Sequence, residues 1–292
     1  MPVSLLLIVR RRFLARTAAA LIVLLIGACT SPHASVMAAE ATKVSHKLDI
    51  RPNPKARWGG GIADVRAVLN STAGELWRYF PKRQLKPILV EPKGGPIVLF
   101  RRGPKGEYHV RLNTGNQLWA QLAYQFAHEM GHILCNYDED QHRHKWFEES
   151  LAELASMFAL RAMAKSWQTN PPYPNWKSYS KALDRYADQL LIDGKLPKDE
   201  KLVTWYKKNA DALARNATDR PKNKIVAAAL LPLFEEHPER WEAITWLNDG
   251  KPKPSQTFAE FLTDWHNNAP PRHRPFVRQI AGKFGVSLGS DG

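Results

Sequence analysis

The chain has 292 residues, of which 44% are hydrophobic and 10 are tryptophans. This length and composition predict a folded protein of one or two domains and argue against a chain that is disordered throughout. The formal net charge of +14 favours anionic neighbours such as lipid headgroups or wall polymers. The alternative is that the charge reflects only a basic, solvated surface. No nucleic acid partner is expected, because no stripe of arginines with interleaved aromatic residues occurs.

Residues 1–28 have the layout of a secretory signal peptide. A basic stretch precedes an apolar run, Thr17 to Ile26, which is too short to span a bilayer as a permanent helix. Ile26-Gly27-Ala28-Cys29 resembles the lipobox of bacterial lipoproteins, in which Cys29 becomes lipid-modified and N-terminal. The run Arg10-Arg11-Arg12-Phe13-Leu14 fits either a twin-arginine export motif or an ordinary basic leader.

These signals predict an exported protein of the periplasm or cell envelope, attached to a membrane through a lipid on Cys29. Thr30, the residue after Cys29, is not the acidic residue associated with inner-membrane retention, so the outer membrane is favoured. If Cys29 is acylated, the one remaining cysteine, Cys135, has no partner for an internal disulfide.

The next part of the chain predicts a tether, a helix and a small sheet. Residues 29–50 are small and polar, as in a tether. Apolar residues at spacings of three and four predict a helix from Ile62 to Phe80. Three short strand-like runs separated by glycine- and proline-containing turns then predict an antiparallel sheet: Pro87–Val90, Ile97–Phe100 and Tyr108–Leu112.

Two longer amphipathic helices are predicted after the strands. The first runs from about Leu118 to Leu134, with Asn113-Thr114 as a candidate cap, and the second from Trp146 to Ala164. The segment between them, 137–145, predicts a solvated hairpin. The rest of the chain predicts helices without a repeat period, over 179–191, 199–215, 223–236, 240–247, 258–265 and 276–284.

The predicted fold class is therefore α+β, with an α-helical domain at the C-terminal end. The expected divisions are a signal peptide (1–28), a tether (29–50), an α+β domain with a small antiparallel sheet and the site helices (51–165), and the helical domain (166–292).

The first long helix carries His128-Glu129-Met130-Gly131-His132, which matches the pattern HExxH. Histidines four residues apart project from one helix face, so His128 and His132 can bind a single Zn²⁺ ion. Glu129 is rotated away from the helix face that carries the two histidines. It is still close enough to the metal position to act as the general base that takes a proton from water.

The second long helix offers a third zinc ligand. Glu149 and Glu153 share a helix face with the small residues Ala152 and Ser156, which would let this helix approach the first. Glu149 is then placed to complete the metal shell, and Glu153 to accept a hydrogen bond from a ligand imidazole. Glu148 stays an alternative ligand if the helix register is shifted.

With this motif the chain resembles the gluzincin group of zinc peptidases, to which thermolysin belongs. Those enzymes pair HExxH with a downstream pattern like N-E-x-x-x-D/E, which Glu148-Glu149-Ser150-Leu151-Ala152-Glu153 fits with Glu148 in the asparagine position. The resemblance implies a zincin-like catalytic domain, with Glu149 as ligand and Glu153 orienting the first histidine. It covers about 86–165, and implies that the strand within 107–113 aligns a peptide substrate.

Other residues are alternatives to these assignments. Asp138 occupies the third ligand position of a different zinc peptidase pattern, HExxHxxGxxH/D, but Cys135 replaces the glycine of its sharp turn. Cys135 itself is expected to be a small buried residue. Tyr206 and His237 are candidates by residue type alone for stabilising an oxyanion.

The sequence thus predicts a zinc-dependent peptidase, most simply an endopeptidase, that hydrolyses peptide bonds with a zinc-activated water and Glu129 as base. The alternative is a catalytically silent relative that keeps the fold to bind a partner in the cell envelope. The intact Glu129 counts against that alternative, since a binding scaffold needs no base. The expected partners are a peptide or protein substrate and, through Cys29, a membrane.

Overall fold

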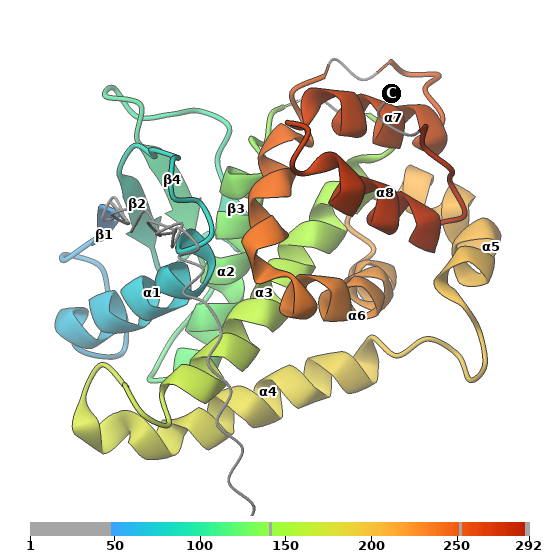
Figure 1. Cartoon of the computed structure of the whole chain (residues 1–292). Coiled ribbons are helices and arrows are strands. Elements are labelled where there is room, and N and C mark those ends of the chain that lie inside the picture. The colour runs from blue at the N-terminus through green and yellow to red at the C-terminus, as the bar shows by residue number, and fades with distance from the viewer. Residues whose placement is uncertain (1–47, 140–141, 251–252, 290–292) are drawn as a thin grey trace, which may run out of the picture. The chain divides into compact units, whose positions relative to one another are not determined.

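The computed structural model describes residues 48–139, 142–250 and 253–289 (Figure 1). In chain order its elements are β1 (Ile50–Pro52), α1 (Ile62–Trp77), β2 (Ile88–Glu91), β3 (Ile97–Val98), β4 (Tyr108–Arg111), α2 (Trp119–Leu134), α3 (Lys145–Ser166), η1 (Pro174–Tyr179), α4 (Ser180–Asp193), α5 (Leu202–Arg215), α6 (Arg220–Glu236), η2 (Pro238–Trp246), α7 (Phe258–Asn268) and α8 (Arg274–Lys283). The elements η1 and η2 are 3-10 helices. The mixture of one small sheet with many helices agrees with the α+β class.

The four strands form a mixed sheet in the order β1-β2-β4-β3, so the predicted antiparallel sheet is wrong. The pairs β1–β2 and β2–β4 are parallel, and only β3–β4 is antiparallel. The strands β2 and β4 are parallel because β3, which lies between them in sequence, pairs on the outer side of β4 and not between the two. The β1–β2 pair is parallel because α1 connects them in a strand–helix–strand crossover. The sequence had marked Ile50 as tether, whereas it begins strand β1.

The helices α2 and α3 pack against each other over the most extensive contact between any two described elements. Gly131 permits this approach, because a Cβ atom on it would lie 2.8 Å from Ala152 Cα and 3.2 Å from Ala155 Cβ. Farther along, Ser156 Oγ donates a hydrogen bond to the Tyr124 carbonyl at 2.9 Å. The small residues expected on the second helix therefore lie in this interface, where they bring the two helices together.

We expect Gly131→Val to lower the free energy of unfolding, by about 1–3 kcal/mol, since the added carbons must push α3 away. Gly74→Ala in α1 is the matched control, because a Cβ atom there meets nothing within 4 Å. It should raise stability by up to about 1 kcal/mol through helix propensity alone. Urea denaturation of both variants checks this, and equal stabilities would contradict the role given to Gly131.

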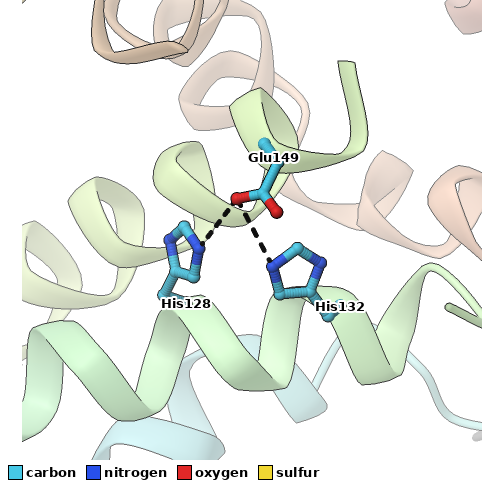
Figure 2. Close-up of side chains that lie close together, drawn as sticks. All are labelled: His128, His132 and Glu149. Atoms are coloured by element: carbon cyan, nitrogen blue, oxygen red, sulfur yellow. Dashed lines mark ion pairs between the residues drawn. The ribbon is translucent and has the colours of Figure 1, made fainter. Parts of the chain in front are cut away.

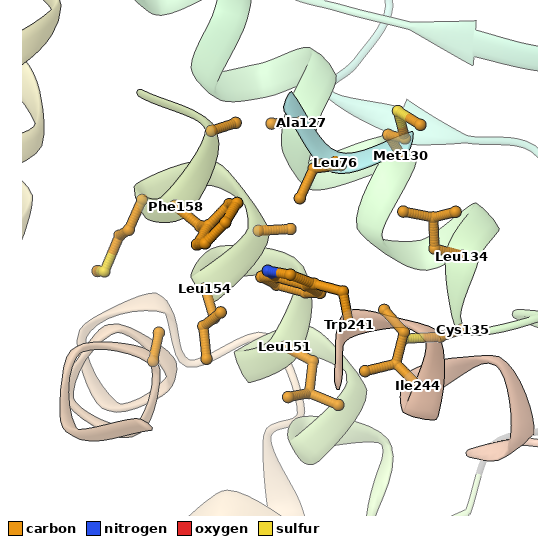
Figure 3. Close-up of a cluster of buried hydrophobic side chains, with 14 of the residues drawn as sticks. Leu76, Ala127, Met130, Leu134, Cys135, Leu151, Leu154, Phe158, Trp241 and Ile244 are labelled. Carbon is orange, nitrogen blue, oxygen red and sulfur yellow. The ribbon is translucent and has the colours of Figure 1, made fainter. Parts of the chain in front are cut away.

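The helix α3 is buried along almost its whole length, because α1, α2, α4 and α6 all pack on it. Trp241 and Ile244 of η2 lie beside α3 side chains and beside residues of α2 in this core (Figure 3). Side chains from both of the predicted domains thus contribute to one hydrophobic core, which extends from Ile50 to Phe284. Several polar residues in the first half of α3 are consequently buried, among them Glu148, Ser150 and Glu153.

Several local predictions need correction. The helix expected over 240–247 is part of the 3-10 helix η2. The helix α2 begins at Trp119 with no side-chain cap, so Asn113-Thr114 does not cap it. The hairpin predicted to be solvated carries His142 and His144, which are buried against the rings of α7 residues such as Phe261. Apolar contact with α7, distant in sequence, covers these two side chains.

The signal peptide, Cys29 and all but the last residues of the predicted tether lie outside the described residues. Among the helices that the structure does describe, none is both long enough and apolar enough to cross a membrane.

Candidate metal centre

His128, His132 and Glu149 converge at one point between α2 and α3 (Figure 2). His128 and His132 lie one turn apart on α2, with ring centroids 5.0 Å apart, and Glu149 faces them from the first turns of α3. Glu149 Oε2 is 3.4 Å from His128 Nε2 and 3.7 Å from His132 Nε2. One ligand atom from each residue lies within 4.8 Å of the other two.

These separations fit a zinc ion. Zinc binds histidine nitrogen and carboxylate oxygen at about 2.0–2.2 Å in tetrahedral geometry, which places two ligand atoms about 3.4 Å apart. The two distances to Glu149 Oε2 are close to that value. Two imidazoles and one carboxylate are also a ligand set that leaves a fourth position for water or substrate, as catalytic zinc sites do.

The second nitrogen of each imidazole faces a carboxylate. His132 Nδ1 is 2.6 Å from Glu148 Oε1, and His128 Nδ1 is 3.6 Å from Glu153 Oε2. Tyr124 fixes the second of these carboxylates by donating its hydroxyl to Glu153 Oε2 at 2.7 Å. A carboxylate at Nδ1 keeps the proton on that nitrogen and leaves Nε2 free to bind a metal. Glu153 thus lies beside the first histidine, although the separation is slightly longer than the hydrogen bond that was expected.

Glu148 has a role that the sequence reasoning missed, as the partner of His132. It is 1% exposed and is held by Lys145 Nζ at 2.8 Å and Asn248 Nδ2 at 2.6 Å. Burial by itself raises the pKa of Glu148, but His132 and Lys145 outweigh it and lower the pKa below its usual value. Asn248 also donates to the Cys135 carbonyl at 3.0 Å, which ties the segment after η2 to the end of α2.

Removing this support should weaken zinc binding. We expect Asn248→Ala to lower zinc affinity by about 10- to 100-fold, because Glu148 then loses a donor and holds His132 less firmly. Asn267→Ala, in α7, is the control of the same residue type and should leave the affinity unchanged. Competition with a chromophoric chelator measures both, and an unchanged affinity in Asn248→Ala would contradict the positioning role.

Glu129 lines the pocket at the metal centre and is not one of the three converging ligands. Its side chain is buried and accepts a hydrogen bond from the backbone N–H of Val98, in β3. Burial raises the pKa of Glu129, although His128 and His132 oppose the rise. A buried carboxylate with a raised pKa beside a metal position is suited to accept a proton from water and release it again.

The pocket has a volume of about 220 Å³ and is bordered by the edge of the sheet. Ile97 and Val98 of β3 line it, whereas the strand β4 within 107–113 is paired on both sides, with β2 and with β3. The expectation that this inner strand aligns a substrate is therefore wrong, because its backbone groups are already used. The strand β3 is the edge that faces the pocket.

The alternative residues lie elsewhere. Asp138 Oδ1 is 3.6 Å from Lys145 Nζ and does not join the three converging ligands. Tyr206 packs among aromatic rings that include Trp146, and His237 is 3.7 Å from an oxygen of Glu239; neither lines the pocket. Cys135 is fully buried, as expected, and burial raises the pKa of its thiol.

Protons compete with a metal for this site. Burial lowers the pKa of His128, but the carboxylates of Glu149 and Glu153 outweigh it and raise the pKa to about 10. Because this value lies above neutrality, the metal-free protein holds a proton on His128 at pH 7 that a metal must displace. We expect the apparent zinc affinity to rise with pH between pH 6 and 9, by about tenfold per unit for each proton displaced.

Calorimetry of zinc binding in two buffers of different ionisation enthalpy measures that release directly. At pH 7 the apparent binding enthalpy should differ between the buffers. Identical enthalpies, together with an affinity that does not change with pH, would show that no proton is displaced from the site.

Comparisons with models of protein families, with curated proteins and with solved structures find no match to this chain. Its function is therefore inferred from its own residues.

Proposed function

We propose that this protein is a zinc-dependent peptidase of the gluzincin type. The observation that carries the proposal is the convergence of His128 Nε2, His132 Nε2 and a Glu149 oxygen at separations suited to one zinc ion, with Glu129 beside them in the same pocket. A structural zinc site has four protein ligands, whereas three ligands and a pocket favour a catalytic one.

The residues have separate tasks in peptide hydrolysis. His128, His132 and Glu149 would hold a zinc ion, which when bound would supply Lewis acidity toward the carbonyl oxygen and the attacking water. A carboxylate oxygen of Glu129 accepts a proton from that water as its oxygen attacks the carbonyl carbon. Glu129 then delivers the proton to the leaving amine nitrogen when the C–N bond breaks, so the carboxylate is regenerated.

The edge strand β3 supports a peptide as the substrate. Its outer edge borders the pocket and pairs with no other described strand. The Val98 N–H on this edge already binds Glu129, so an extended peptide would pair through the other backbone groups of the edge. Such pairing recognises the main chain and would align a peptide bond of varied sequence beside the metal position. Backbone pairing along the cleft is consistent with an endopeptidase.

The proposal is tested by giving the protein zinc and a mixed-sequence peptide library. We expect one zinc per chain by elemental analysis, and peptide products by mass spectrometry that disappear when a chelator removes the metal. A protein that binds stoichiometric zinc and leaves every peptide intact would favour the silent binding protein instead. A protein without stoichiometric zinc would contradict both.

We also propose that the protein is exported and anchored in the cell envelope through Cys29, with the outer membrane as the favoured location. The lipobox-like sequence before Cys29 supports this. Cys29→Ser should release the protein from the membrane fraction, and a variant that stays there would contradict the anchor.

A further inference from the structure

The pocket at the metal centre combines apolar and cationic surfaces. Pro96, Ile97, Val98 and Phe100 line it with apolar side chains, and Ile97 and Phe100 are 43% and 41% exposed. Thr218, just before α6, and Arg220, the first residue of α6, contribute a polar surface to the same pocket. A group that enters the pocket therefore meets a guanidinium as well as the metal position.

Arg220 is a cation that no protein carboxylate neutralises. Lys145, the other Lys or Arg side chain of the pocket, is already bound to Glu148. Within residues 48–139, 142–250 and 253–289, Arg220 makes no hydrogen bond or ion pair. It also lines a small adjoining cavity beside His128 and Glu153, so its charge lies close to the metal ligands.

A guanidinium in this position is suited to a carboxylate. Arginine presents parallel N–H donors that match the two oxygens of a carboxylate, and such charge-assisted pairs are stronger than neutral hydrogen bonds. Arg220 is itself solvent-exposed, so its guanidinium is accessible to an incoming carboxylate, and the pair forms in competition with water. Because Arg220 and the metal ligands line one pocket of about 220 Å³, a bound carboxylate would lie within a residue or two of the bond at the metal.

This inference rests on the proposed function: we propose that Arg220 is a specificity-determining residue that binds a substrate carboxylate close to the cleaved bond. The carboxylate is the free C-terminus of a peptide or an acidic side chain, and both present the same group to the guanidinium. The favoured substrates are then peptides with an acidic group near the scissile bond.

The test measures binding, so that it does not depend on turnover. Zinc-loaded Glu129→Gln protein is titrated with three acetylated hexapeptides built from alanine, glutamine and one phenylalanine. The first is neutral with a C-terminal amide, the second has a free C-terminal carboxylate, and the third is amidated with glutamate in place of one glutamine. The same titrations are made with the double variant that also carries Arg220→Gln. The control is the double variant that carries Arg215→Gln instead, because Arg215 is an exposed arginine at the end of α5.

We expect one of the two acidic peptides to bind about 10- to 100-fold more tightly than the neutral one, and that peptide identifies the source of the carboxylate. The ratio should fall toward one in Arg220→Gln and persist in Arg215→Gln. The assignment would be overturned if the acidic and neutral peptides bound equally well before the substitution. It would also be overturned if the preference for the acidic peptide persisted in Arg220→Gln. A loss of zinc affinity in Arg220→Gln would overturn it as well, and would mean that Arg220 acts through Glu153.

The outcomes for the two proposals are distinguishable. If the wild-type protein prefers the acidic peptide but cleaves no library peptide, the peptidase proposal fails and the carboxylate site remains. If the wild-type protein cleaves peptides equally well with and without acidic groups, the carboxylate site fails and the peptidase proposal remains.

Discussion

Glu129→Gln is expected to reduce peptide hydrolysis by about 10²- to 10⁴-fold while the protein keeps its zinc. The amide of glutamine has nearly the shape of the carboxylate but cannot accept the proton of the attacking water. Glu129 is not among the three converging ligands, so metal binding should persist. The Val98 N–H can donate to the amide oxygen as it does to the carboxylate, so the local fold should be preserved.

Elemental analysis and the rate of product formation are measured on the same preparation, so that a loss of activity is not mistaken for a loss of metal. Glu139→Gln, outside the pocket, is the matched control and should hydrolyse peptides at the wild-type rate. Hydrolysis at an unchanged rate in Glu129→Gln would contradict the assignment of the base. Loss of zinc in that variant would instead make Glu129 a ligand.

Glu149→Ala is expected to cause the largest loss of zinc affinity among the variants proposed. The substitution removes one of the three proposed ligands. The loss of zinc affinity should therefore exceed the loss of about 10- to 100-fold that is typical when a residue that only orients a ligand is removed. In the metal-free protein, burial raises the pKa of Glu149, but His132 and His128 outweigh it and lower the pKa to about 2. Glu149 is therefore already ionised at neutral pH and needs to lose no proton to bind zinc.

The control for Glu149→Ala is Glu236→Ala, at the exposed end of α6, which should leave zinc affinity unchanged. Competition titrations with a chelator of known affinity give both values. Glu148→Gln should fall between them, because Glu148 holds His132 but faces its Nδ1 nitrogen. If Glu148→Gln were the more damaging of the two glutamate substitutions, Glu148 would replace Glu149 as the third ligand.

The geometry of the candidate metal centre is predictable from the sequence because it depends on helix periodicity. His128 and His132 are four residues apart on one helix, and Glu149 and Glu153 are four apart on the next, so each pair shares a face whatever the rest of the fold does. Helix periodicity alone does not show whether the two faces meet. The small residues on the second helix indicate that they do, and in the structure Ala152 lies against Gly131.

The supporting residues were not predictable in the same way. Asn248 reaches Glu148 from beyond η2, and Arg220 enters the pocket from the start of α6, so both depend on how distant helices pack. Neither residue lies in a sequence pattern that marks its place. The direction of the strands was likewise unpredictable, because runs of two to four residues carry an alternation of apolar and polar side chains but no information on parallel pairing.

The most direct test of the metal centre is a crystal structure of the zinc-loaded protein with anomalous data at the zinc edge. We expect one anomalous peak, with His128 Nε2, His132 Nε2 and one oxygen of Glu149 each about 2.0–2.2 Å from it. A peak ligated by other side chains, or Glu149 turned away from the two imidazoles, would contradict the proposed centre and the chemistry inferred from it.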